Sequence, residues 1–218
     1  MAATSRGNRR QLRALDHTFR FLPPVLGEQG FTAEQIKLVM AEIREEFQRL
    51  LPQIPDIGGA RNRLHTHILL EAAHNLALYN VLRRRGQTVA QVGPLIVETF
   101  RRRMFHYPRA GRWLASRLVF HRRLLDRFRR LARESQAREY PEHWVYRFVE
   151  GDGRNFDYGI DYEECAIVKF YRSQGAVELA PYCCQQDFPM SDALGWGLRR
   201  TTTIAEGGAI CDFRFKRS

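Results

Sequence analysis

Residues 155–215 read NFDYGIDYEECAIVKFYRSQGAVELAPYCCQQDFPMSDALGWGLRRTTTIAEGGAICDFRF. All four cysteines of the protein lie in this stretch: Cys165, Cys183, Cys184 and Cys211. Thiols and carboxylates are side chains that carry out nucleophilic and acid–base catalysis, and this stretch holds both. We therefore expect the chemistry here, and we interpret the first 140 residues as a helical scaffold.

The hydrophobic pattern of the C-terminal region predicts short strands and helices. Strands are expected over residues 143–149, 156–161, 196–204 and 209–215, and helices over residues 162–173 and 177–186. Residues 205–208, Ala-Glu-Gly-Gly, are typical of a hairpin turn between the last two strands. The sequence predicts an α+β fold, in which a bundle-like helical half precedes a small antiparallel sheet of about four strands with two inserted helices.

The first 140 residues have the pattern of amphipathic helices. Capping boxes begin at Thr32 and at Thr88, each followed three residues later by a glutamine. Long helices are expected over residues 60–85 and 113–138, the second covered with arginines. The predicted organisation is a basic helical region at 1–140 and an α+β domain at 141–218, packed as one unit.

The charge of the chain is unevenly distributed. The formal net charge is +11, and the first 140 residues hold 26 Lys and Arg against 12 Asp and Glu. A basic half could bind nucleic acid or an anionic membrane surface, but arginine-rich helix faces exposed to solvent are the better explanation. Because no motif for reading bases is present, we expect no nucleic-acid partner.

The chain contains neither a membrane-spanning run nor the apolar core of a signal peptide. We expect a cytoplasmic protein with a small-molecule substrate and no membrane partner, and a homo-oligomer is left open. Its cysteines are expected to be reduced, so catalysis, metal binding or burial explains them better than disulfides do.

The cysteines differ in their sequence surroundings. Cys165 is expected near the N-terminus of a helix, where backbone N–H groups lower a thiol pKa. Cys184 lies three residues before Asp187, so a helical turn would place the carboxylate beside the sulfur. Cys211 alternates with Phe213 and Phe215 and is equally well explained as a small buried apolar residue. No cofactor is expected, and zinc on the cysteines is the weaker alternative, since no Cys-x-x-Cys knuckle occurs.

Arg200 stands on an otherwise apolar predicted strand. A buried guanidinium needs an anionic partner, because burying it unpaired is costly. The candidates are Asp161, Asp187, Asp212 or the carboxylate of a substrate, and the residues alone do not choose between them.

Taken together, these motifs resemble the L-2-amino-thiazoline-4-carboxylic acid hydrolase family. The resemblance covers residues 155–215 and is weaker in the helical part. It rests on one ordered set of motifs: Cys165 after Tyr162-Glu163-Glu164, then Pro181-x-x-Cys184-x-x-Asp187, Arg200-Thr201-x-Thr203, Gly207-Gly208 and Cys211-Asp212-Phe213-x-Phe215.

The resemblance implies hydrolysis of a cyclic amidine to a carbamoyl amino acid. From the chemistry of their side chains, the expected catalytic residues are Cys184, Asp187 and Cys165, and either cysteine could attack C2 of the ring or orient water. Substrate binding is expected from Arg200, Thr203, Asp212, Cys211 and Asp161, and no metal is expected. Two alternatives remain open from the residues: another enzyme of specialised metabolism on the same scaffold, such as a cyclase, a lyase or an amide or lactam hydrolase, and a ligand-binding module without turnover.

Overall fold

The computed structural model describes residues 2–217, with side chains from residue 9 onward. The described residues form two compact units, one ending at Arg103 and the other beginning at Met104. The helices at 109–135 fall in the second unit, together with the sheet.

The first unit is built from helices. They are α1 (Ala2–Thr18), α2 (Leu22–Glu28), α3 (Ala33–Leu50), a short 3-10 turn η1 (Leu51–Gln53), α4 (Arg63–Arg84) and α5 (Val89–His106), whose last residues continue into the second unit. The predicted capping box at Thr32 is confirmed: the Gln35 N–H donates to Thr32 Oγ1, and the Thr32 N–H donates to Gln35 Oε1. Helix α3 packs against α4, and Ile43, Phe47 and Leu76 are fully buried there.

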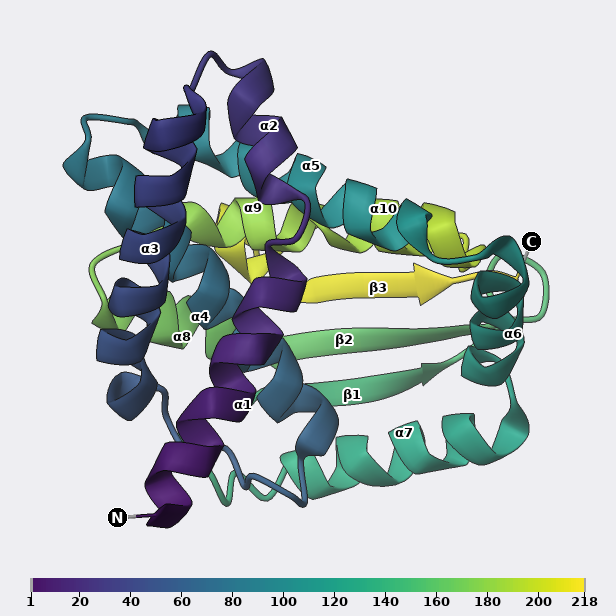
Figure 1. Ribbon diagram of the computed structural model, residues 1–218. Helices are drawn as coiled ribbons and strands as arrows, with labels where there is room; N and C mark the ends of the chain where they lie inside the picture. Colours follow the sequence, from purple (N-terminus) through teal and green to yellow (C-terminus); the bar gives the residue numbers. More distant parts are fainter. Residues whose placement is uncertain (1, 218) are drawn as a thin grey trace. The chain divides into compact units, whose positions relative to one another are not determined.

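The second unit is α+β, as predicted. Its elements are α6 (Arg109–Val119), α7 (Arg122–Ser135), β1 (Val145–Glu150), β2 (Tyr158–Glu164), α8 (Ala166–Ser173), η2 (Val177–Leu179), α9 (Ala180–Gln185), α10 (Asp187–Leu194), η3 (Ile204–Glu206) and β3 (Cys211–Phe215). The sheet is antiparallel with the order β1-β2-β3, so β2 is central. Figure 1 shows α7 running alongside β1, in agreement with the contacts between these two elements.

The sheet has three strands in the described part of the chain, so the prediction of about four is corrected. The segment predicted as a strand at 196–204 forms only one bridge, Arg199 to Arg214. Gly195 and Gly197 adopt positive φ angles of 63° and 52°, which breaks the extended backbone. The expected hairpin turn is instead the 3-10 turn η3, capped by Thr203.

Two helix predictions also need correction. The helix expected over residues 113–138 is two helices, because the chain turns at Phe120 and His121. The His121 ring nitrogen accepts the N–H of Arg123 at 3.3 Å and so caps α7. The helix expected over residues 162–173 begins at Ala166, since Tyr162–Glu164 complete β2. In the described part of the chain, no helix has the length and apolarity that crossing a membrane requires.

Candidate active site

The centre of the site is an ion pair between Asp187 and Arg200. Arg200 Nη1 lies 2.7 Å from Asp187 Oδ2, and both terminal nitrogens donate to the Cys184 carbonyl at 3.2 Å. The guanidinium lies between the rings of Phe188 and Phe213, at 5.0 and 5.1 Å from their centres. Only 5% of the Arg200 side chain is exposed, against 25% of the Asp187 side chain, so the guanidinium is shielded from water and the carboxylate is partly accessible. Of the three carboxylates expected as partners, Asp187 is the one that binds Arg200.

Asp187 is placed by a change of helix direction. Helix α9 ends at Gln185 and α10 begins at Asp187, so the carboxylate stands at the first position of α10. Burial raises the pKa of Asp187 to about 7, although the charge and the hydrogen bond of Arg200 lower it. Both protonation states are therefore populated at neutral pH, as a group that takes up and releases protons requires.

Burial disfavours the thiolate forms of Cys165 and Cys184, and Cys184 lies beside this pair. Cys165 is the N-cap of α8, and the N–H groups of Ile167 and Val168 favour its thiolate. Burial nevertheless raises the pKa of Cys165 to about 11, so the expected lowering is wrong: desolvation outweighs the helix terminus. Burial and the charge of Asp187 also raise the pKa of Cys184.

The remaining two cysteines have protein partners. Cys183 is buried, and its sulfur lies 2.9 Å from the Tyr171 hydroxyl. Cys211 is also buried, and its sulfur accepts the Ile204 N–H at 3.2 Å. Burial raises the pKa of the Cys211 thiol. Electrostatic interactions link Cys165 with both Cys184 and Cys211, so these three thiols form one neighbourhood.

Three of the expected substrate-binding residues bind other parts of the chain. Asp161 pairs with Arg214 at 2.6 Å. The Thr203 hydroxyl donates to Glu206 Oε2 at 2.6 Å and is 1% exposed. Asp212 accepts the N–H groups of Thr201 and Thr202 at 2.8 Å and the Thr201 hydroxyl at 2.6 Å. The contacts of Thr203 and Asp212 stabilise the segment that carries Arg200, whereas the Asp161–Arg214 pair joins β2 to β3.

Asp212→Ala is expected to destabilise the protein by about 2 kcal/mol, because it removes three hydrogen bonds, two of them to backbone N–H groups. Urea unfolding followed by circular dichroism measures this change. Asp192→Ala, at an exposed position on α10, is the matched control. An unchanged midpoint for Asp212→Ala would show that the 201–202 segment does not depend on this carboxylate.

Tyr162 is a site residue that the sequence did not single out. On β2 it is paired with Tyr146 of β1 and Cys211 of β3, and its ring contacts that of Phe213 at 5.4 Å. Among the described residues its hydroxyl has no hydrogen-bond partner. Burial, together with Tyr146, Asp187 and the nearby thiols, raises its pKa well above the usual value, so the phenol remains a hydrogen-bond donor. The sequence predicted a helix from residue 162 onward, so neither the place of Tyr162 on β2 nor its neighbours were predicted.

We expect Tyr162→Phe to lower kcat/KM about tenfold with an unchanged unfolding temperature, because only one donor is lost. Steady-state kinetics and a thermal melt test this together. A parallel fall in melting temperature would assign the hydroxyl to folding.

Across residues 2–217, no group of three or more His, Cys, Asp or Glu side chains is placed to hold a metal ion. The polar residues of α4 have protein contacts: Glu71 lies 3.7 Å from His67 and 2.8 Å from Arg103, and His74 Nδ1 lies 3.1 Å from Thr18 Oγ1. Burial lowers the pKa of His74 to about 3, so its ring stays neutral.

Comparison with known proteins decides the family. The family model described as L-2-amino-thiazoline-4-carboxylic acid hydrolase matches residues 67–215. The chain belongs to this family. In this chain the matched stretch extends beyond the motifs at 155–215 into the helical part, where it takes in α5 and most of α4. No curated protein and no solved structure matches the chain.

Proposed function

We propose that this chain hydrolyses a small nitrogen- and sulfur-containing ring, a cyclic amidine of the 2-amino-thiazoline-4-carboxylate type. Its membership of a family named for that hydrolysis supports the reaction class. The Asp187–Arg200 ion pair, inside the matched stretch and with its guanidinium buried, is the observation that carries the assignment of residues. The product is a carbamoyl amino acid, N-carbamoyl-cysteine for the family's named substrate.

Asp187 transfers the protons in this mechanism. Its carboxylate removes a proton from water as the water oxygen bonds to C2 of the ring, between sulfur and nitrogen. As the C2–S bond breaks, the new C2 hydroxyl becomes the urea carbonyl. Its proton passes to the ring nitrogen, which received the C=N electron pair when water added, and the carboxylic acid returns the first proton to the departing sulfur. A pKa of about 7 allows the same group to serve in both steps at neutral pH.

Arg200 holds the acid and the substrate together. Three of its five N–H groups are used by Asp187 and the Cys184 carbonyl, which leaves donors for the substrate carboxylate. The neutral thiols of Cys184 and Cys165 line the site and orient the ring or the attacking water. Burial raises the pKa of Cys165 to about 11, so its thiolate is disfavoured at neutral pH, which argues against direct attack by this sulfur.

Carbon-13 NMR of substrate labelled at C2 tests the reaction. With purified protein, the amidine resonance should be replaced by that of a urea carbon, at a rate proportional to protein concentration. Binding without this conversion, seen as line broadening of an unchanged resonance, would assign the chain to ligand binding and reject the hydrolase proposal.

Cys184→Ala separates two mechanisms. If Asp187 activates water, this variant should retain activity within about tenfold of the parent, because only an orienting contact is lost. Cys183→Ala, which changes the neighbouring buried thiol, is the matched control. Complete loss of turnover in Cys184→Ala, together with a substrate adduct on the parent protein in intact mass spectra, would instead make Cys184 a nucleophile.

A further inference from the structure

The outward face of α6 exposes large apolar side chains. Trp113, Leu114 and Leu118 are 58%, 54% and 55% exposed. Phe105 and Tyr107, just before the helix, are also exposed, and we call these five residues the α6 patch. Nine large apolar side chains are exposed among those described, and five of them lie in this one segment. The solvent face of a helix is normally polar, so a patch of this kind marks an interaction surface.

The sequence around the α6 patch is cationic. Residues 104–125 include five arginines and neither Asp nor Glu. Arg109, Arg117, Arg122 and Arg123 are exposed, and none has an ion-pair partner in the part of the chain that the structure describes. The Arg117 guanidinium lies 4.4 Å from the centre of the Trp113 ring, so charge and apolar surface are presented together.

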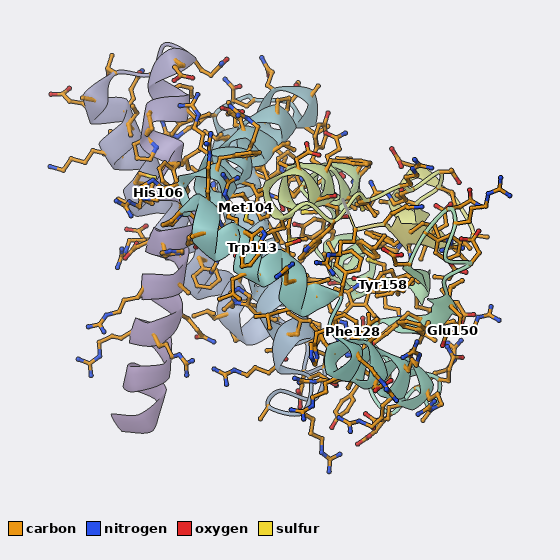
Figure 2. The ribbon with its side chains drawn as sticks, turned by 90° about the vertical axis from the view of Figure 1, so that its right-hand side faces the viewer. Met104, His106, Trp113, Phe128, Glu150 and Tyr158 are labelled. Carbon is orange, nitrogen blue, oxygen red and sulfur yellow. The ribbon has the colours of Figure 1, made fainter. Side chains whose placement is uncertain are left out.

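The opposite face of α6 is held by the protein. Helix α6 packs against α10, and Arg112 Nη1 donates to the Ala193 carbonyl at 3.4 Å. Ala115 and Val119 are partly buried on this inner side. Trp113 of α6 is labelled in Figure 2. The exposed apolar residues are therefore not the helix's packing face.

We propose that the α6 patch binds the surface of an anionic phospholipid membrane. Trp, Tyr and Leu side chains enter the boundary between headgroups and acyl chains, while flanking arginines attract anionic headgroups. A second copy fits less well, because pairing two copies of this arginine-rich segment brings like charges together. Nucleic acid would use the arginines but leave Leu114 and Leu118 without a role. Surface binding needs no spanning segment, so it is compatible with the helix lengths of this chain.

Vesicle sedimentation tests the proposal without any substrate. Full-length protein is mixed with phosphatidylcholine vesicles that contain about one-third phosphatidylglycerol, and with vesicles of phosphatidylcholine alone. We expect the partition coefficient to be at least about tenfold higher on the anionic vesicles and to fall at high salt, because screening weakens the arginine contribution. Equal partitioning to both vesicles, or none to either, would overturn the proposal.

Paired variants locate the binding surface. Trp113→Ser/Leu118→Ser should lower the partition coefficient about tenfold or more, whereas Leu38→Ser/Leu64→Ser, at similarly exposed positions on α3 and α4, should leave it unchanged. If Trp113→Ser/Leu118→Ser shows no thermal unfolding transition, Arg117→Glu/Arg123→Glu takes its place. Its partition coefficient should likewise fall about tenfold or more. Equal losses in patch and control variants would reject this surface. The protein could instead form dimers in the absence of vesicles, or bind a labelled oligonucleotide. If either property is lost in the patch variants, this face binds that partner, and the proposal of membrane binding is rejected.

Discussion

Replacing Asp187 by asparagine is expected to lower kcat/KM about a thousandfold, because the variant keeps the side chain's shape but cannot accept a proton from water. The burial that raises the pKa of this carboxyl to about 7 also makes it the group best suited to proton transfer at neutral pH. Initial rates of ring opening over a range of substrate concentrations give this value.

Asp192→Asn is the matched control for this change, since it makes the same substitution on the same helix at an exposed position. Its kcat/KM should equal that of the parent within a factor of about two. If Asp187→Asn also stays within tenfold of the parent while remaining folded, Asp187 does not transfer the proton.

Arg200→Gln is expected to shift the acidic limb of the pH–rate profile to higher pH. The positive charge of Arg200 and its hydrogen bond lower the pKa of Asp187, so their removal raises that pKa above about 7. The base form then becomes scarcer at pH 7, and activity there should fall about a hundredfold, with the deficit narrowing as pH increases. Measuring kcat/KM from pH 5 to pH 10 follows the limb directly.

Arg200→Lys provides the comparison for charge alone. It keeps a cation beside Asp187 but cannot reproduce the two-pronged contact with the Cys184 carbonyl. Its acidic limb should stay near that of the parent although its activity falls. An unshifted limb in Arg200→Gln would mean that Asp187 is not the group whose ionisation controls the rate.

Features governed by local sequence could be predicted. The capping box at Thr32 and the alternation that marks β1 and β2 depend on neighbouring residues, and the structure has the corresponding elements. The interruption between α6 and α7 is also local, but the apolar and arginine pattern continues through His121 and hides it.

Features set by residues distant in sequence could not be predicted. The segment expected as a fourth strand is held by the Asp212 carboxylate, which takes backbone N–H groups that a strand ladder would otherwise use. The sequence offered three carboxylates as possible partners of Arg200, and only the packing of the chain brings Asp187 to it. The thiol pKa of Cys165 likewise depends on its burial by other elements. The position of Cys165 at a helix N-terminus does not predict that burial.

The most direct test of the proposed chemistry is mass spectrometry of L-2-amino-thiazoline-4-carboxylate incubated with the parent protein, Asp187→Asn and Asp192→Asn. The mechanism predicts a time-dependent gain of one water with the parent and with Asp192→Asn, and its near absence with Asp187→Asn. Turnover by all three proteins would contradict the role of Asp187. No turnover by the parent protein, with this substrate and with related cyclic amidines, would contradict the hydrolase itself.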